Sequence, residues 1–499
     1  RWEVAQMQFA AAEEHLRACL ASNASVETRA DAAAWLGRCA ILSGGHSAEA
    51  ALAALESVAA EIRPVDLVRS LELGAELLMV ATAVLRLQGE YGGHLERFHH
   101  QARGHPEFEA VAALHDARQS LFHGGSATAA MDQVQSALMS GLPRGAETAM
   151  LLALYLLRWG ERYDLASRVL AAGLEQARIE GHAARQGILH GERAATALAQ
   201  GSLHDAQVEA ETGLVLVEYP HFAILQLSAV AILVHIERGD LDTAAEVAHN
   251  VDVLGFSEDH VYLAEFLLAR GRLRIAQGLV REGVADLMWC GEQLRALGLV
   301  WPNEMDGYAA AALASLGERD AAAALRSELL VTARRVGSPV ALGKSLRLAA
   351  AAGPDEERLG LLQEAVSVLE PTPARLELAH ALAELGTELA RLGRRCEGRD
   401  AQRSAIELAD ECGAVALGQR ARNDLQAGPG RRARTELTGR GALTAAEWRV
   451  SKQAVSGRTN REIAQELFVT EKTVERHLSN AYQKLGIRSR FQLAGAIRD

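Results

Sequence analysis

The sequence is poor in aromatic residues and prolines, and it has no long uninterrupted apolar run. Phe, Trp and Tyr make up 4% of the 499 residues, whereas 49% are hydrophobic, and there are only 10 prolines. The core must therefore be built from Ala, Leu and Val, a composition that favours closely packed helices. No apolar run reaches the ~18 residues that a membrane-spanning helix needs. We predict an all-α protein without a membrane partner.

Cysteine is also scarce, which argues against structural disulfides and metal sites. The five cysteines are scattered and include no C-x-x-C pair, as expected of free thiols in a reducing cytoplasm. Histidines at 94, 99, 100 and 105 follow a Gly-Gly pair without a carboxylate at ligand spacing. A solvated loop or an interhelical face explains them better than a metal site. The chain begins Arg1-Trp2-Glu3, with no initiator Met and no signal-peptide pattern, so we read it as a fragment of a longer, cytoplasmic protein.

Negative charge dominates the chain but not its C-terminal end. The formal net charge is −12, with 52 Lys and Arg against 64 Asp and Glu. Residues 431–499 hold 14 of the basic and 7 of the acidic residues, so this segment carries +7 and the rest carries −19. A small basic module on an acidic body is typical of a protein that holds DNA at one end. An ordinary soluble surface with a basic excess is the alternative.

Residues 1–424 have the periodicity of a helical repeat. Gly201, Gly239, Gly278 and Gly317 are spaced 38 or 39 residues apart, and each opens a short polar turn. Similar turns are expected at Gly45, Gly89, Gly124, Gly160, Gly353 and Gly393.

Small residues inside this region recur with gaps of 12 and 7, as expected where the two helices of a hairpin touch. The sets are Ala194, Ala206, Gly213; Gly271, Gly283, Cys290; Gly386, Gly398, Ala405; and, with one larger member, Ala310, Ala322, Leu329. The pattern predicts a degenerate tetratricopeptide-like repeat, whose stacked units form a superhelix. A non-repeating helical bundle is the alternative.

Two other segments need an interpretation. The stretch from Gly337 to Ser345 resembles a phosphate-binding loop, but it has five residues where that loop needs four before Gly-Lys. Pro339 is better explained as the first residue of a helix. Gly, Pro and Arg replace apolar periodicity after the repeats, so residues 425–437 are predicted to be a linker. No nucleophile–base pair, metal cluster or phosphate loop stands out, and we predict neither an enzyme nor a cofactor.

Residues 443–493 contain three helix starts that capping chemistry predicts. Thr444 with Glu447, and Thr459 with Glu462, fit the capping box S/T-x-x-E. The Thr470 hydroxyl can accept from the backbone N–H of residue 472 or 473. A short helix is thus expected over 460–467, followed by a turn and a longer helix.

The two helices have matching apolar faces and one strongly polar face. Apolar residues recur at helical spacing in both, namely Ile463, Ala464 and Leu467, then Val474, Leu478 and Leu485. Such a pair is a helix-turn-helix, whose second helix can lie in the DNA major groove. An amphipathic helix in an ordinary bundle is the alternative.

This stretch closely resembles the LuxR-type DNA-binding domain, a four-helix helix-turn-helix module of bacterial transcription regulators. The resemblance covers about 55 residues. The matching residues are Leu443, Thr444, Glu447, Val450, Gly457, Thr459, Asn460, Glu462, Ile463, Ala464, Leu467, Thr470, Lys472, Thr473, Val474, His477, Leu478, Asn480, Lys484, Leu485, Ser489 and Arg490.

The resemblance implies a recognition helix over about 470–485 within a DNA-binding domain over 438–499. It implies that Glu475, Arg476 and Ser479 face bases, although family members often have a basic residue at the position of Glu475. Lys472, Thr473 and Lys484 are expected near phosphates. Thr459, Asn460, Thr470, His477 and Asn480 complete the expected DNA-binding set.

Taken whole, the chain resembles the C-terminal part of the large ATP-binding regulators of the LuxR family. It would account for their helical-repeat middle and their DNA-binding domain. Their ATPase module is absent, and ATP is expected only there. We therefore predict a sequence-specific DNA-binding transcription regulator, with double-stranded DNA and RNA polymerase as partners. The repeats would sense an inducer or a partner protein; the alternative is a repeat scaffold with an accessory DNA-binding module.

Overall fold

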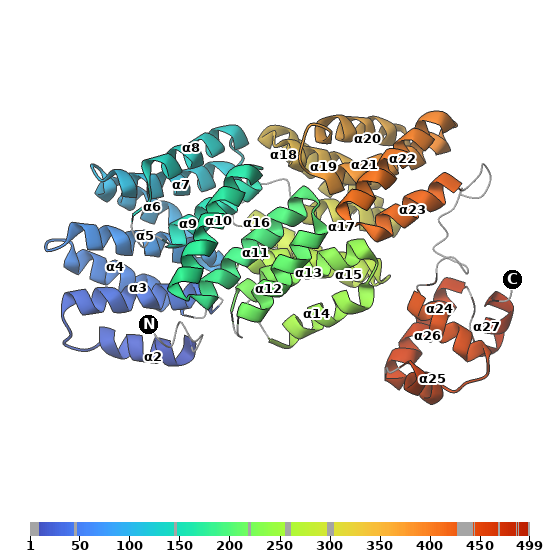
Figure 1. Cartoon of the computed structure of the whole chain (residues 1–499), viewed down its shortest axis with the longest axis horizontal. Coiled ribbons are helices and arrows are strands. Elements are labelled where there is room, and N and C mark those ends of the chain that lie inside the picture. Colours follow the sequence, from blue (N-terminus) through green and yellow to red (C-terminus); the bar gives the residue numbers. More distant parts are fainter. Residues whose placement is uncertain are drawn as a thin grey trace. The chain divides into compact units, whose positions relative to one another are not determined.

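The structure is a computed structural model in which contacts divide the chain into two compact units, residues 1–425 and 426–499. It describes residues 9–43, 47–143, 147–217, 221–254, 261–296, 304–426, 443, 445–467, 470–485, 487 and 489–497. Within these ranges the regular structure is helical, which confirms the all-α prediction (Figure 1). No described helix is both long and apolar enough to cross a lipid bilayer.

The first unit is an array of antiparallel helices. Its helices are α2 Phe9–Leu20, α3 Val26–Leu42, α4 Ala48–Ile62, α5 Leu67–Ala83, the 3-10 turn η1 Leu85–Leu87, α6 Gln88–Ala102, α7 Pro106–Phe122, α8 Ala127–Ser140, α9 Glu147–Trp159, α10 Tyr163–Glu180, α11 Ala183–Gln200, α12 Leu203–Leu216, α13 Ala223–Arg238, α14 Leu241–Leu254, α15 Val261–Ala276, α16 Val280–Ala296, α17 Glu304–Ser315, α18 Arg319–Val336, α19 Pro339–Ala352, α20 Asp355–Leu369, α21 Arg375–Arg391, α22 Arg395–Cys412 and α23 Val415–Gln426.

Consecutive helices pair into hairpins, and the hairpins stack on one another. From α11 to α22 each hairpin packs its two helices closely, and its first helix also contacts the first helix of the next hairpin. Each unit therefore buries its apolar face against its neighbours, as in solenoid proteins. The predicted tetratricopeptide-like array of hairpins is confirmed, and the alternative of a non-repeating bundle is not.

Small residues lie where the hairpin helices touch, as their spacing predicted. A Cβ atom on Gly398 would lie 2.9 Å from the carbonyl oxygen of Gly386, and one on Gly283 would lie 2.6 Å from that of Gly271. Ala194 and Ala206 are fully buried in the corresponding hairpin. A larger side chain at these positions would force the helices apart.

Most of the predicted turn glycines do end helices. Gly201, Gly239, Gly278 and Gly317 have φ between +81° and +89°, in the left-handed region that glycine adopts without strain. Gly124 and Gly393 have similar values. Gly160 and Gly353 lie in turns without positive φ, and Gly45 lies outside the described residues.

Gly89 was predicted wrongly, because α6 runs through it and through the Gly-Gly pair before the histidine group. Tyr91, Leu95 and Phe98 are buried at helical spacing along α6. This packing outweighs the low helix propensity of glycine. His94 is buried among them, so the interhelical face, not the solvated loop, describes its position. No group of three metal-ligating side chains occurs in the described part of the chain.

Residues far apart in the sequence meet along a seam in this unit. The N–H of Phe222 donates to the carbonyl of Leu42 (3.0 Å), and the N–H of Val340 donates to the Glu161 carboxylate (2.9 Å). The backbone N of Leu376 would lie 2.8 Å from a Cβ atom on Gly201. These pairs are 175 to 180 positions apart, so the superhelix closes on itself after several hairpins.

The second unit is a small bundle of α24 Ala445–Val455, α25 Asn460–Glu466, α26 Glu471–Leu485 and α27 Arg490–Ile497. Its core consists of Val450, Ala454, Ile463, Ala464, Val474, Leu478 and Leu493. The four helices match the predicted four-helix module. Residues 427–442, which include most of the predicted linker, lie outside the described residues, whereas 425 and 426 belong to α23.

Candidate nucleic-acid interface

The short helix α25 begins with the capping box that its sequence predicts. The Thr459 hydroxyl accepts from the backbone N–H of Glu462 (3.3 Å), and the Glu462 carboxylate accepts from the N–H of Thr459 (2.7 Å). The pKa of the Glu462 carboxyl is lowered by this N–H of Thr459 and by the Thr459 hydroxyl, which donates to the same carboxylate oxygen (2.9 Å). The helix ends at Glu466, one residue before the predicted end. Reciprocal capping therefore fixes the point where the chain enters the helix.

The longer helix α26 begins directly after Thr470, as predicted. The Thr470 hydroxyl accepts from the backbone N–H of Thr473 (3.2 Å), and the two hydroxyl oxygens lie 2.8 Å apart. The other predicted capping residue, Thr444, lies outside the described residues, although α24 begins at Ala445. The N–H groups of the first turn of α26 therefore lie beside two exchangeable hydroxyls, which suits contact with an anion.

The two helices pack through the apolar faces that the sequence predicted. Ile463 and Val474 are fully buried, and Ala464 and Leu478 are nearly so. Leu467 and Leu485 are partly buried against the same core. Since this packing occupies one side of α26, its polar side faces outward.

Arg490 ties α27 to the start of α25, a role that the sequence did not reveal. Its guanidinium donates to the Asn460 side-chain oxygen (2.9 Å), and also to the backbone carbonyls of Arg458 and Ala454. The turn between α24 and α25 holds Gly457 at φ +89°. Asn460 was predicted as a DNA contact, but its side-chain oxygen already accepts a hydrogen bond from Arg490 within the unit. No local sequence pattern indicates these hydrogen bonds, because they join residues that are 30 or more positions apart.

The outward side of α26 carries most of the predicted DNA-binding residues. Lys472, Glu475, Arg476 and Ser479 are exposed, as are Thr459 and Thr470 beside the helix starts. Thr473, His477 and Asn480 are partly buried along its edges. Lys484 lies in the last turn of α26, but its side chain lies outside the described residues.

This arrangement has the chemistry of a duplex-reading helix. Arg476 and Lys472 offer positive charge and N–H donors, and Glu475 and Ser479 offer acceptors on the same side. Arginine can bind guanine through two hydrogen bonds, and a carboxylate can accept from the cytosine amino group. Lysine and hydroxyl groups near a helix start suit phosphate contacts. The face can therefore combine base reading with backbone contacts.

Comparison with known proteins finds matches to this unit. The family model described as "Bacterial regulatory proteins, luxR family" matches residues 441–496. The spore germination protein GerE of Bacillus subtilis (strain 168) is 47% identical over 57 residues, which are 11% of this chain and 77% of GerE. An HTH-type transcriptional regulator of Mycobacterium tuberculosis (strain ATCC 25618 / H37Rv) is 44% identical over 68 residues, 14% of this chain. The match spans only 8% of that regulator's length.

Solved structures also align with this chain, at low identity. A Rap protein complexed with competence and sporulation factor aligns with 78% of this chain and 99% of its own, at 11% identity and a TM-score of 0.46. The APC/C hetero-tetramer Cut9-Hcn1 aligns with 100% of this chain and 95% of its own, at 12% identity and a TM-score of 0.38.

Proposed function

The chain belongs to the luxR family of bacterial regulatory proteins, and is by that membership a DNA-binding transcriptional regulator; we propose that it recognises a specific DNA sequence through α26. The observation that carries this proposal is the exposed polar face of α26, held outward by the packing of Ile463, Ala464, Val474 and Leu478. A helix held in this way can enter the major groove of duplex DNA.

Individual roles follow from reach and chemistry. Arg476, Glu475 and Ser479 would read base edges from the middle of the helix. Lys472, Thr473 and Lys484 would contact phosphates and fix the register of the helix on the duplex. Thr459, Asn460, Thr470, His477 and Asn480 flank this face. A further proposed partner is RNA polymerase, which the DNA-bound protein would contact. The proposed location is the cytoplasm.

The helical array would sense an inducer or a partner protein and control how the DNA-binding unit is presented. An array of stacked hairpins supports this, because such arrays offer extended inner surfaces to a ligand. The second candidate function is a scaffold in which the array binds a partner protein and the DNA-binding unit is accessory. The size of the helical array, which makes up most of the chain, supports this second candidate. No catalytic role and no cofactor are part of either proposal.

The test is selection of bound sequences from a random DNA pool, first with the whole chain and then with residues 431–499 alone. The regulator proposal expects both to enrich the same sequence motif. If the whole chain enriches no motif, sequence-specific recognition is refuted. If only the whole chain enriches one, α26 does not carry the specificity, and the scaffold proposal gains support.

A further inference from the structure

The interior of the helical array contains a cavity of about 180 Å³. A single water needs roughly 10–15 Å³ measured in the same way, so the cavity is large enough for a small organic molecule. Its walls come from α9, α11, α13, α15, α17, α19 and α21, the first helices of successive hairpins. The turn between α9 and α10 and the first residue of α10 complete them. The cavity is thus the inner surface of the superhelix, narrowed to the size of a small ligand.

Charged side chains from widely separated helices line this cavity. The anions are Glu161, Glu237, Glu265, Glu304 and Glu377, and the cations are Arg158, Arg272 and Lys344. Five carboxylates against three cations leave a formal excess of two negative charges at the wall. Two more carboxylates (Glu192, Glu384), the Arg347 guanidinium and the His380 imidazole pair with these residues, so carboxylates still outnumber the cationic groups around the cavity.

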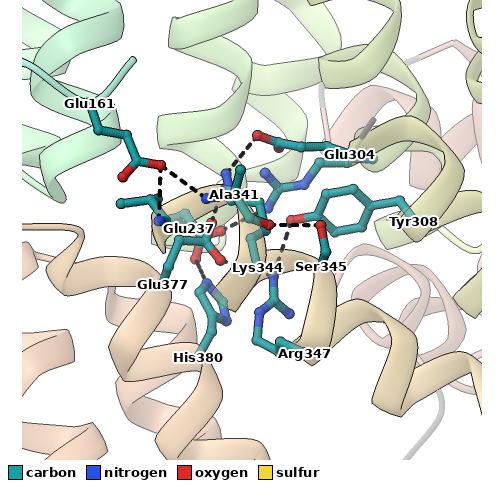
Figure 2. Close-up of polar contacts among 12 residues, drawn as sticks. Glu161, Glu237, Glu304, Tyr308, Ala341, Lys344, Ser345, Arg347, Glu377 and His380 are labelled. Atoms are coloured by element: carbon teal, nitrogen blue, oxygen red, sulfur yellow. Dashed lines mark hydrogen bonds and ion pairs between the residues drawn. The ribbon is translucent and has the colours of Figure 1, made fainter. Parts of the chain in front are cut away.

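Most of the wall carboxylates are already paired with a cation. The Lys344 ammonium lies 2.7 Å from the Glu304 carboxylate and 3.2 Å from that of Glu377 (Figure 2). Glu237 accepts from Arg272 (2.9 Å) and from His380 (3.0 Å). Burial alone would raise the pKa of Glu237, but His380 and Arg272 outweigh it and hold that pKa at about 2.

Glu161 and Glu265 are compensated less well. Glu161 accepts from the backbone N–H group of Ala341 (3.1 Å; Figure 2). It also accepts from the N–H group of Val340 (2.9 Å) and from the Ser338 hydroxyl, and all three donors are neutral. Glu265 shares Arg158 with Glu192. Burial raises the pKa of both Glu161 and Glu265 above the usual range. A buried carboxylate of this kind gains stability when a positive charge arrives beside it.

The rest of the cavity wall is apolar and aromatic. Leu198, Leu233 and Leu268 line it together with Trp159 and Tyr163. The wall thus combines carboxylates with hydrocarbon and with aromatic rings, whose faces attract cations. The same combination disfavours an anion, which would meet the excess negative charge in a poorly hydrated site.

We propose that this cavity is the effector site of the helical array, and that it takes a small organic cation with an ammonium or guanidinium group on an apolar body. The proposal rests on the proposed function, of which it names the ligand class. Glu161 and Glu265 receive the positive charge, and the leucines and aromatic residues cover the body. The cavity volume excludes a folded partner as its occupant.

The site is placed where a ligand can act on the whole array. Glu161 caps the start of α19 from a position 177 to 180 residues earlier, across the seam of the superhelix. Among the described residues it is the one non-glycine with positive φ, at +61°. Its three hydrogen bonds hold this strained conformation in place. A cation bound to Glu161 would change that contact, and with it the packing of two parts of the array.

The test is calorimetric titration of the whole chain with matched probes. The cations are phenethylammonium and butylguanidinium, and the controls are neutral 2-phenylethanol and anionic 3-phenylpropanoate. The expected result is one site per chain for a cation, with the neutral and anionic molecules about tenfold weaker or worse. The proposal is overturned if neither cation binds the folded chain, or if 2-phenylethanol binds as well as phenethylammonium.

Variants locate the site. The double substitution Glu161→Gln with Glu265→Gln should weaken cation binding about tenfold or more, whereas Glu246→Gln, on the exposed face of α14, should leave it unchanged. Ala199→Leu, which fills the cavity without changing a charge, should abolish binding and keep the circular dichroism melting curve intact. Unchanged affinity in Ala199→Leu refutes the site even if the double variant unfolds.

The measurement also separates this proposal from the proposed function. Titration needs no DNA, so failure to bind a cation leaves DNA selection untouched. Conversely, a chain that binds the cation but enriches no DNA motif retains the cavity as a ligand site and loses its role as a regulator's effector site.

Discussion

At the scale of single residues, Arg476 carries the sharpest prediction for DNA recognition. It is exposed in the middle of α26, where a guanidinium can reach a guanine edge. Arg476→Ala should cost about 1–3 kcal/mol at one base position of the selected site and relax the preference there. Binding to a set of single-base variants of the site measures this. Equal losses on specific and random DNA would refute a base-reading role.

Lys484 should behave differently, because a phosphate contact carries no sequence information. Lys484→Ala is expected to weaken binding to all DNA sequences by a similar factor. It should also make the dependence of affinity on salt shallower by about one counterion. Titrations at several salt concentrations give the slope, and an unchanged slope would contradict the phosphate role.

His115 predicts a pH dependence of stability that is unrelated to DNA. It is fully buried, with Nδ1 3.0 Å from the Tyr91 hydroxyl oxygen, and burial lowers its pKa to about 3. The unfolded chain, with a pKa near 6.5, binds the proton first, so the folded state loses stability as pH falls from about 6.5 toward 3. The loss from this group between pH 6.5 and 5 should be about 2 kcal/mol.

The check is chemical denaturation between pH 7 and 5 with His115→Gln, which keeps a polar partner for Tyr91. This variant should show a flatter pH dependence than the parent. His100→Gln is the control, since His100 is exposed on α6 and should change little. A parent and a His115→Gln variant with identical pH profiles would rule out the buried neutral histidine as the cause.

Single residues also show where sequence reasoning stops. The rejection of Gly337–Ser345 as a phosphate loop is supported by α19, which begins at Pro339. The sequence could not predict that Lys344 from this stretch lies between Glu304 and Glu377. Nor could it predict that Arg490 fastens Asn460. Such contacts join residues 30 or more positions apart, and local spacing holds no information about them.

At the scale of helices, the capping box of α25 makes a stability prediction. Thr459→Ala removes the hydroxyl that accepts from the Glu462 N–H and should destabilise the DNA-binding unit by about 1 kcal/mol. Thr459→Ser keeps the acceptor and should cost much less. Denaturant unfolding of residues 431–499, in which Trp448 is the only tryptophan, measures both by fluorescence. Equal stability of the Ala and Ser variants would show that the cap contributes nothing.

Helices were predictable where a local rule acts without competition. The starts of α25 and α26 followed from hydroxyl residues at fixed offsets, and the hairpin contacts followed from small residues 12 and 7 positions apart. The prediction of a turn at Gly89 was wrong because it considered only the low helix propensity of glycine. It did not consider the buried side chains that follow at helical spacing along α6. A Cβ atom on Gly89 would meet nothing within 4 Å, so packing does not require a glycine at this position. Tertiary packing decided the conformation there.

At the scale of the whole first unit, the repeat period predicted hairpins but not how the superhelix closes. The stacking of hairpins depends only on contacts between neighbouring repeats, which the spacing of small residues and glycines in the sequence predicts. The seam depends on the small rotation between successive repeats, added up over several hairpins, and sequence spacing does not give this rotation. The cavity exists because of this closure, since its walls include both Glu161 and Glu377. This is why the candidate DNA interface could be predicted from residues 443–493, while the cavity could not.

Two glycines with the same backbone conformation test the closure directly. Gly181 and Gly201 both end helices in the left-handed region, with φ +70° and +89°. A Cβ atom on Gly181 would meet nothing within 4 Å, whereas one on Gly201 would lie 2.8 Å from the backbone N of Leu376 and 3.0 Å from the Cys412 sulfur. Substitution by alanine therefore strains the backbone at both positions, but it creates a steric clash only at Gly201.

Gly181→Ala should cost about 1–2 kcal/mol from backbone strain alone. Gly201→Ala should cost a further 1–3 kcal/mol or so, because overpacking pushes apart two segments that lie 175 positions apart. Denaturant unfolding of both variants gives the difference, which isolates the seam since the strain term cancels. Equal costs at the two positions would mean that these segments do not touch in solution, and that the inner surface of the array is open instead of closed around a cavity.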